Sequence, residues 1–409
     1  MQELRDTFCT RDLSERPAML HAHGISLENP GNYHAMIGRY LSANCIDLGI
    51  SHVGECPGGR GARWKKTPAQ GPTASVGPAS PDEPEAQPAY SRHTVAVSRD
   101  HTDIGPQYYG DSPFTARMRF HQSWYRARVL GVPYGTGPRQ TDTAYYGNML
   151  SRPDGEKGLN FVAPEAFSVA GSRLAQSGGV VEPFRLLHNM LSSQPMCFNL
   201  FGPLATDPDL ATLAFRVLLG SEEVQRVSEL VLEYAPEPKS EYLNDRTAFD
   251  AFASYERPDG QLGFLGIETK LTEPFSQKRY DSPAYRRWVE LQDSPWPRES
   301  WGRLADTEHN QLWRDHLLAV AMLRHPESPY ASGRFALVRH PEDQGCADVV
   351  HRYRRLLKPD DGTFMDLPLD HMVGSWQQGL PAVCTEWLDS LHLRYLDLGA
   401  SEEAWGLRS

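Results

Sequence analysis

The stretch TAFDAFASYERPDGQLGFLGIETKL, residues 247–271, decides the fold of this chain. Two runs rich in aromatic and aliphatic residues flank Arg257-Pro258-Asp259-Gly260. Proline fixes φ for a turn, and the Asp-Gly pair supplies the positive φ that a three-residue loop with a glycine bulge requires. The stretch therefore predicts a β-hairpin with strands over 247–256 and 262–271.

The hairpin brings acidic residues together. If residues 258–260 form the loop, pairing outward from it places Asp250 opposite Glu268. Side chains alternate between the faces of a strand, so Glu268 and Lys270 are expected on one face with Asp250. Gly266 lies on that face and is expected to leave room for a metal ion and a phosphate. The other face is expected to carry Leu265, Ile267, Thr269 and Leu271.

Two carboxylates and an ammonium on one face suit metal-assisted hydrolysis. Mg²⁺ prefers oxygen ligands, keeps several waters and takes further ligands from a substrate phosphate. A lysine beside it can orient or help deprotonate the attacking water and stabilise negative charge. The alternative is a solvated hairpin face with Asp250 as a cross-strand ion-pair partner. A second Glu-x-Lys match at 237–239 lies in a proline-containing loop and cannot present its side chains from a central strand.

Composition bounds the class of protein. The chain has 409 residues, is 40% hydrophobic and carries a formal charge of -11, which argues against a protein that coats nucleic acid nonspecifically. It has no apolar run of about 20 residues and no secretion signal, so we expect a soluble cytoplasmic protein. Its six cysteines include no Cys-x-x-Cys pair, which favours reduced thiols.

The chain divides by composition into three parts. Residues 1–55 have a mixed pattern and no assignable fold. Residues 56–110 are expected to be a largely disordered linker, because the stretch 56–90 is rich in Pro, Gly, Ala and Ser and nearly lacks large aliphatic residues. Residues 111–409, where aromatic and aliphatic residues are dense, are expected to form the main domain.

Other elements are expected around the hairpin. Periodicity predicts helices over 180–204, with a break at Pro195, and over 208–219, and strands over 227–234 and 335–338. Asp306-Thr307 is expected to begin a helix that runs to Leu323. Its Gln311 either reaches the active site or lies on the surface, and the surface is favoured. The basic residues Arg352, Arg354, Arg355 and Lys358 fit a nucleic-acid contact and a solvated helix face equally well.

At this point the residues resemble the PD-(D/E)XK nuclease superfamily, whose motif is an aspartate on one strand and Glu-x-Lys on the next. Here Asp250 precedes Glu268-Thr269-Lys270, and Phe249 replaces the proline that names the motif. The stretch from about Arg117 to Glu273 resembles a bacterial branch of restriction-endonuclease-like proteins. The resemblance implies an α/β fold, a mixed central sheet flanked by helices, here with an N-terminal extension.

The resemblance also implies roles. Asp250 and Glu268 would bind Mg²⁺ or Mn²⁺, and Lys270 would assist the water. Glu182 is the candidate for a third metal ligand on the helix before the strands, with Glu222 and Glu223 as competitors and helix capping as the alternative. The implied activity is hydrolysis of DNA, in restriction or antiphage defence, and a homodimer would suit cutting both strands. A noncatalytic nucleic-acid-binding module is the second hypothesis, and a protein unrelated to nucleic acid the third.

Overall fold

The computed structural model describes residues 7–9, 50–55, 62–66, 94–95, 103–138, 145–176 and 181–405. The chain forms two compact units, Met1–Pro88 with Arg139–Thr141, and Ala89–Pro138 with Asp142–Ser409. In the first unit, β1 (Thr7–Cys9), β3 (Ala62–Lys66) and β2 (Ile50–Glu55) form an antiparallel sheet in that order.

The stretch predicted as a linker contains short strands. β3 falls within it, as do β4 (Thr94–Val95) and β5 (Gln107–Tyr108), which pair with each other. Composition gave no sign of these strands. The rest of the stretch up to residue 102 lies outside the described residues, so its disorder stays a prediction.

A five-stranded mixed sheet is the centre of the second unit. Its strands lie in the order β12-β11-β10-β9-β8. β8 pairs antiparallel with β9 and β9 with β10, whereas β10, β11 and β12 run parallel. The bounds are β8 Arg226–Tyr234, β9 Phe249–Glu256, β10 Leu262–Lys270, β11 Tyr330–Arg339 and β12 Phe364–Pro368.

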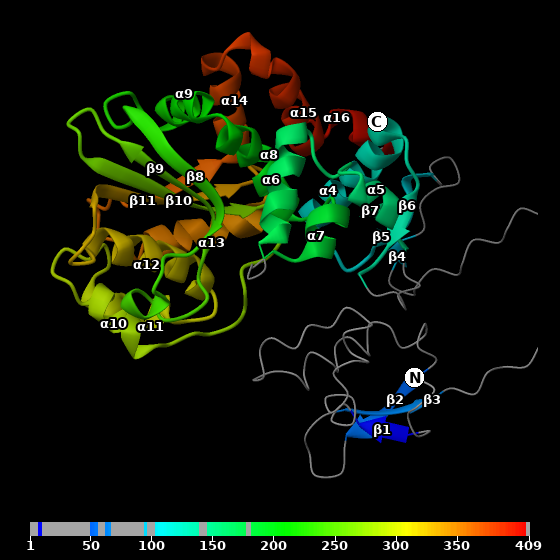
Figure 1. The fold of residues 1–409 in the computed structure, drawn as a ribbon, viewed down its shortest axis with the longest axis horizontal. Coiled ribbons are helices and arrows are strands. Elements are labelled where there is room, and N and C mark those ends of the chain that lie inside the picture. The colour runs from blue at the N-terminus through cyan, green and yellow to red at the C-terminus, as the bar shows by residue number, and fades with distance from the viewer. Residues whose placement is uncertain are drawn as a thin grey trace, which may run out of the picture. The chain divides into compact units, whose positions relative to one another are not determined.

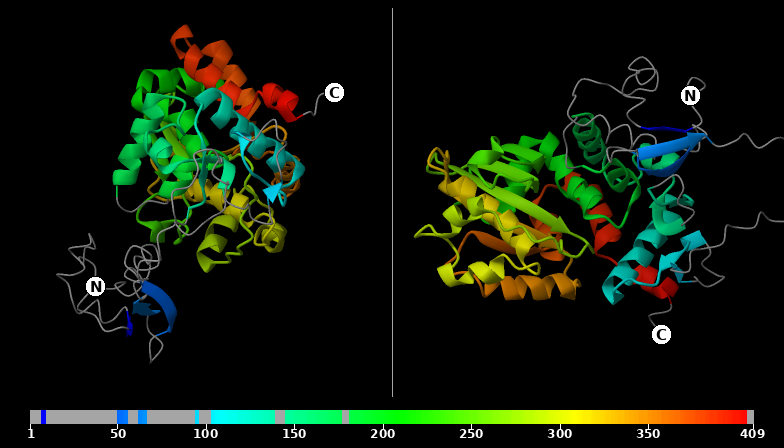
Figure 2. Two further views of the ribbon diagram at one scale, coloured as in Figure 1. Left: turned by 90° about the vertical axis from the view of Figure 1, so that its right-hand side faces the viewer. Right: turned by 90° about the horizontal axis from the view of Figure 1, so that it is seen from below.

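Helices cover both faces of this sheet (Figure 1), and the left view of Figure 2 also shows helices above and below the strands. One layer includes α8 (Ser193–Thr206), α9 (Pro208–Leu219) and α14 (Leu369–Gly379). The other includes α10 (Pro283–Val289) and α12 (Asn310–Arg324). The predicted α/β class, a mixed sheet flanked by helices, is confirmed.

The second unit contains further helices and strands. The elements that precede β8 in the chain are α4 Pro113–Trp124, the π-helix η3 Tyr125–Leu130, β6 Tyr134–Thr136, β7 Tyr145–Leu150, α5 Arg152–Glu156, α6 Pro164–Ala175 and α7 Pro183–His188. Later come α11 Trp301–Leu304, α13 Gln344–Arg354, α15 Thr385–Tyr395 and α16 Gly399–Trp405. Within the described ranges, no helix has both the length and the apolar content needed to cross a bilayer.

Each sheet face has its own hydrophobic core. The first core joins α8, α9 and α14 to Ala251, Ala253, Leu265 and Ile267. The second core joins α10 and α12 to Phe249, Phe252, Phe264 and Phe335. β10 is buried along nearly its whole length, because it is the middle strand and both of its faces are covered. A polar side chain near its end therefore sits at the meeting point of several elements.

The hairpin forms as the sequence predicted. β9 and β10 pair from Leu262 with Glu256 through Ile267 with Ala251. Gly260 has a φ of 79°, and its amide donates to the Arg257 carbonyl at 2.9 Å. A residue with a Cβ rarely adopts this conformation, so the glycine supplies what the turn requires.

Two helix boundaries differ from the prediction. The expected helix over 180–204 is two helices, α7 and α8, and Pro195 lies in the first turn of α8, where proline is tolerated. α12 begins at Asn310, several residues after Asp306-Thr307, because the His309 amide donates to the Asp306 carbonyl at 3.2 Å and closes a separate turn before the helix.

Candidate active site

The motif residues lie at the end of the central strands, where β10 finishes and β9 starts. The Lys270 Nζ contacts Glu268 Oε1 at 3.0 Å, and both side chains are more than nine-tenths buried. Gln311 Nε2, from α12, donates to the same oxygen at 2.9 Å. The favoured surface position for Gln311 was wrong: the side chain is half-buried and reaches the site, because α12 packs against this face of the sheet.

Asp250 is held by the strand beside it. Its Oδ2 accepts the amide of Thr269 at 2.8 Å and the Thr269 hydroxyl at 2.7 Å. The paired register ends at Ile267 and Ala251, so the next row puts Asp250 opposite Glu268. Among the described residues, no hydrogen bond reaches Asp250 Oδ1 or Glu268 Oε2, and each carboxylate therefore has one oxygen available.

The facing prediction needs one correction. Thr269 was expected to point away from Asp250, but its hydroxyl contacts the carboxylate. Phe249 and Phe252 both belong to the second core, whereas Ala251 belongs to the first, so strict alternation fails at Asp250. The strand turns there and directs the carboxylate toward the amide of Thr269.

The expected space at Gly266 is filled. A Cβ on this glycine would meet the ring of Phe249 at 2.6 Å. Gly266 is therefore required for the packing of Phe249, the residue that stands in the motif's proline position. Room for a phosphate has to lie beyond the strand ends.

Burial shifts the protonation of the acidic residues. The pKa of Glu268 rises to about 7, first through burial and only partly offset by the charge of Lys270. Burial raises the pKa of Asp250 as well, and the charge of Glu268 adds to the shift. Burial lowers the pKa of Lys270, but the nearby carboxylates, Glu268 first, outweigh it and raise that pKa above its usual value. The lysine therefore keeps its proton.

Glu182 has a different role from the one predicted. Its two carboxylate oxygens accept the amides of Phe184 and Arg185, at 3.2 and 2.6 Å, and cap α7. The side chain is exposed. Glu182 therefore acts as a helix cap, which was the alternative to the metal role, and its carboxylate does not lie with Asp250 and Glu268.

The competing glutamates also lie elsewhere. Glu223 accepts hydrogen bonds from Tyr255 at 2.8 Å and from Ser332 at 2.6 Å. Tyr255 stands near the other end of β9 from Asp250. Glu222 is exposed beside Gly220. Neither residue contacts the motif.

Two buried carboxylates that sequence reasoning missed lie near the motif. Glu233 on β8 and Asp315 on α12 are 6% and 5% exposed. Burial raises the pKa of both, and the charge of Asp250 contributes in each case; that of Asp315 reaches about 7. For Glu233 the available signal was an acidic residue inside the apolar run VLEY, whereas Asp315 stands between Arg314 and His316 and carried no comparable signal.

A pocket of about 590 Å³ lies next to the end of β10. Its wall includes Thr272, Glu273, Phe275 and Cys346. The ammonium of Lys270 lies over the Phe275 ring, 5.3 Å from its centroid. The pocket therefore offers a surface beside the motif on which a substrate could rest.

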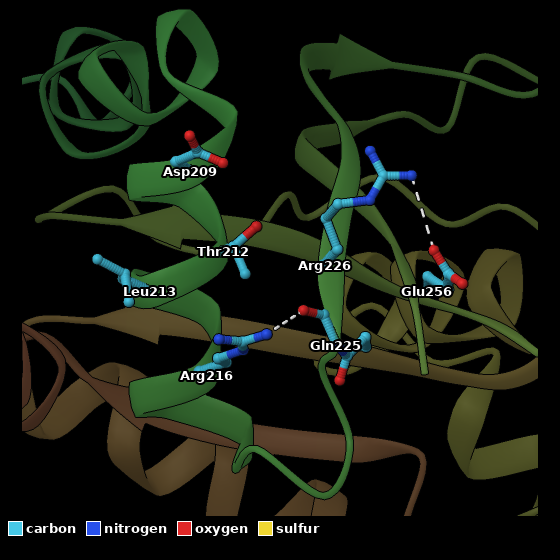
Figure 3. Close-up of a pocket in the computed structure, with 7 residues that line it drawn as sticks. All are labelled: Asp209, Thr212, Leu213, Arg216, Gln225, Arg226 and Glu256. Carbon is cyan, nitrogen blue, oxygen red and sulfur yellow. Dashed lines mark hydrogen bonds and ion pairs between the residues drawn. The ribbon is translucent and has the colours of Figure 1, made fainter. Parts of the chain in front are cut away.

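A second pocket, of about 510 Å³, lies at the opposite end of β9 (Figure 3). Arg216 there donates to the Gln225 carbonyl, and Arg226 pairs with Glu256 at 3.6 Å. Glu256 is the last residue of β9, so this pocket lies far along the strand from Asp250.

Three of the four basic residues at 352–358 make contacts within the fold. Arg352 pairs with Glu308 at 2.6 Å, and Lys358 donates to the Gln292 carbonyl at 3.2 Å. The Arg354 guanidinium lies 5.8 Å from the Phe364 ring centroid. These contacts favour the reading as an ordinary helix surface over a nucleic-acid contact.

Comparison with known proteins identifies the family. A family model described as the PD-(D/E)XK nuclease superfamily matches residues 109–397, well over half of the chain. The chain belongs to the PD-(D/E)XK nuclease superfamily. The match spans α4 through α15 and includes the hairpin with Asp250, Glu268 and Lys270. No curated protein and no solved structure matches the chain.

The donor set fits a divalent cation that keeps most of its water. In the described part of the chain, no group of three or more His, Cys, Asp or Glu side chains is arranged to hold a metal ion. Mg²⁺ is commonly bound through one or two carboxylates plus waters and substrate phosphate. Asp250 and Glu268, each with an available oxygen, meet that need.

Proposed function

We propose that this PD-(D/E)XK protein is a Mg²⁺- or Mn²⁺-dependent deoxyribonuclease that uses Asp250, Glu268 and Lys270. The observation that carries the proposal is the contact of Lys270 with Glu268, whose neighbour Thr269 holds the Asp250 carboxylate, inside the region matched by the nuclease family. Buried carboxylates with raised pKa values beside a protonated lysine are typical of catalytic groups.

Each residue has a definable part in hydrolysis. Asp250 and Glu268 provide oxygens for the cation, while Thr269 and Gln311 fix their orientation. A bound divalent ion lowers the pKa of water and neutralises charge on the phosphodiester. Because Lys270 keeps its proton, it stabilises the negative charge that develops on the phosphate oxygens and does not serve as the base. The water oxygen would bond to phosphorus as the water releases a proton to solvent, and the P–O bond to the leaving group would break as that oxygen takes a proton from solvent.

The direct test is DNA cleavage. Wild-type protein, Lys270→Ala and Lys239→Ala are incubated with plasmid and linear DNA, with Mg²⁺ and with EDTA. Lys239 is a matched control, since it ends the other Glu-x-Lys match but lies at the start of an exposed 3₁₀ turn. We expect metal-dependent cleavage that Lys270→Ala abolishes and Lys239→Ala keeps.

Other outcomes separate the alternatives. Binding of DNA without cleavage by the wild type would point to a noncatalytic module that retains the nuclease fold. Cleavage that survives in Lys270→Ala would overturn the assigned chemistry. Circular dichroism of each variant checks that the fold is intact.

The proposal extends to the biological setting on the family resemblance. We infer a role in restriction or antiphage defence in the cytoplasm, with a homodimer for cutting both DNA strands. Phage plating on cells that carry wild-type or Lys270→Ala protein tests the role, and light scattering of the purified protein tests the dimer. Equal plating on both cell lines would refute the defence role.

A further inference from the structure

A third carboxylate lies in line with the two of the motif. β8 and β9 pair Leu232 with Ala251 and Tyr234 with Phe249. Glu233 lies between these pairs and is therefore opposite Asp250. The β9–β10 register, continued by one pair beyond Ala251 and Ile267, brings Glu268 into the same row, so that three neighbouring strands carry three acidic residues there.

The backbone at Glu233 is unusual. Its φ is 58°, in the left-handed region that residues with a Cβ rarely adopt. Leu232 belongs to the first core while Tyr234 packs on the second, so this conformation breaks the alternation of β8. Strained backbone of this kind clusters at functional sites. In β8 it occurs at the position opposite Asp250.

The Glu233 side chain is held in place. Gln194 Nε2, in the first turn of α8, donates to Glu233 Oε1 at 3.1 Å. Arg173 donates to the Glu233 backbone carbonyl. The carboxylate is buried, and its Oε2 receives no hydrogen bond from the described residues. Two helices therefore fix a buried acid with one free oxygen next to Asp250.

Like charges directly opposite each other on neighbouring strands destabilise a sheet. Lys270 supplies one positive charge for Glu268, but Glu233 and Asp250 have no such contact among the described residues. A divalent cation in this row would relieve the repulsion. This row of acidic residues is thus suited to binding a cation.

An independent observation also points to an absent ligand. The Asp315 side chain is only 5% exposed, and its Oδ2 has no hydrogen-bond partner among the described residues. It follows Gln311 by one turn of α12, on the same face, and Gln311 contacts Glu268. A buried carboxylate oxygen without a donor indicates a place for a water or an ion. Acidic oxygen atoms therefore face the motif from the α12 side as well.

We propose that Glu233 is a positioning residue for the cation, accepting a hydrogen bond from a water ligand of the ion that Asp250 and Glu268 bind. This rests on the proposed function. An outer position fits because no three carboxylates are arranged for direct ligation in the described chain, and because Mg²⁺ keeps several waters. Glu233 then strengthens cation binding without touching the ion.

Mn²⁺ binding to the metal-free protein, measured by titration calorimetry without DNA, tests this role. We expect Glu233→Gln to weaken Mn²⁺ binding about tenfold, the usual scale for a lost hydrogen bond to a charged group. Glu229→Gln is the matched control, because Glu229 is exposed on the same strand. Its Mn²⁺ affinity should equal that of the wild type.

Glu233→Gly guards against a variant that fails to fold. This variant removes the carboxylate. It also relieves the backbone strain, because glycine adopts a φ of 58° readily. We expect it to melt at a higher temperature than wild type in EDTA and to bind Mn²⁺ at least tenfold more weakly. A purely structural glutamate would give a lower melting temperature and unchanged affinity.

The outcomes also separate this inference from the proposed function. Wild-type Mn²⁺ affinity in Glu233→Gly, together with lost binding in Asp250→Asn, would overturn the role of Glu233 and leave the nuclease proposal standing. Wild-type affinity in Asp250→Asn would overturn both.

Discussion

Replacing Asp315 with asparagine should change how stability depends on pH. Asp315 is buried on α12 with one oxygen unpartnered, and burial raises its pKa from 3.8 to about 7. In the metal-free protein the folded state therefore holds a proton on Asp315 at pH values where the unfolded state has lost it. Asparagine is neutral at every pH and removes this difference.

The sign and size follow from linkage. Because the folded-state pKa is above the unfolded-state value, Asp315 contributes stability that is fully present below pH 3.8 and lost as pH rises through about 7. A shift of about 3 units at roughly 1.4 kcal/mol per unit gives at most about 4 kcal/mol. The free energy of unfolding of wild type should thus fall, relative to Asp315→Asn, by up to about 4 kcal/mol between pH 4 and pH 8.

Urea denaturation in EDTA at several pH values measures this difference. The difference between the two pH slopes reports the titration of Asp315 together with its electrostatic effect on Glu268, whose pKa the Asp315 charge raises. Asp389→Asn, at an exposed position on α15, is the control and should follow the wild-type slope. Parallel curves for wild type and Asp315→Asn would refute the shifted pKa and with it the picture of a buried, unpartnered acid.

Three further substitutions probe the site. Gln311→Leu removes the hydrogen bond to Glu268, and we expect DNA cleavage at least tenfold slower with an unchanged circular dichroism spectrum; an unchanged rate would contradict a role for Gln311. Gly266→Ala places a methyl group against the Phe249 ring and should cost about 1–3 kcal/mol in urea denaturation, a cost that would be absent if this space were open. Glu182→Ala should lower stability by about 1 kcal/mol through the lost cap of α7 and leave Mn²⁺ affinity unchanged; weaker Mn²⁺ binding would restore the predicted metal role.

The sequence was sufficient where structure is local. The Pro-Asp-Gly turn determines the register of the hairpin, so the pairing from Leu262 with Glu256 through Ile267 with Ala251 could be derived before any coordinates. The same holds for α9, whose observed bounds of Pro208–Leu219 equal the predicted run. In both cases a few adjacent residues determine the geometry.

The sequence was insufficient where distant segments meet. Gln311 contacts a residue 43 positions earlier, and only the packing of α12 on the sheet brings it there. Glu233 reaches its row because β8 pairs with β9 across a connection that no short turn defines. Glu182 shows the converse: a glutamate just before a helix-starting proline suits capping, and that local preference decided its role.

The departures at Asp250 and Gly266 have one cause. Alternation assumes a regular strand, but β9 turns at Asp250, which sends its carboxylate toward Thr269 and allows Phe249 to cover Gly266. The alternation of side chains along a strand therefore gave the wrong direction for the Asp250 side chain. The proposed chemistry depends on that side chain.

The distribution of charge along β9 argues that the motif end is functional. Near the far end, Glu223 accepts hydrogen bonds from Tyr255 and Ser332 and lies near Arg257, and these groups outweigh burial and lower its pKa. At the motif end, burial prevails and the pKa values of Asp250 and Glu233 rise. Glu223 thus has a cationic neighbour at one end of the sheet, whereas Asp250 and Glu233 at the motif end form no ion pair among the described residues. The divalent cation proposed for the reaction would supply the positive charge that Asp250 and Glu233 lack.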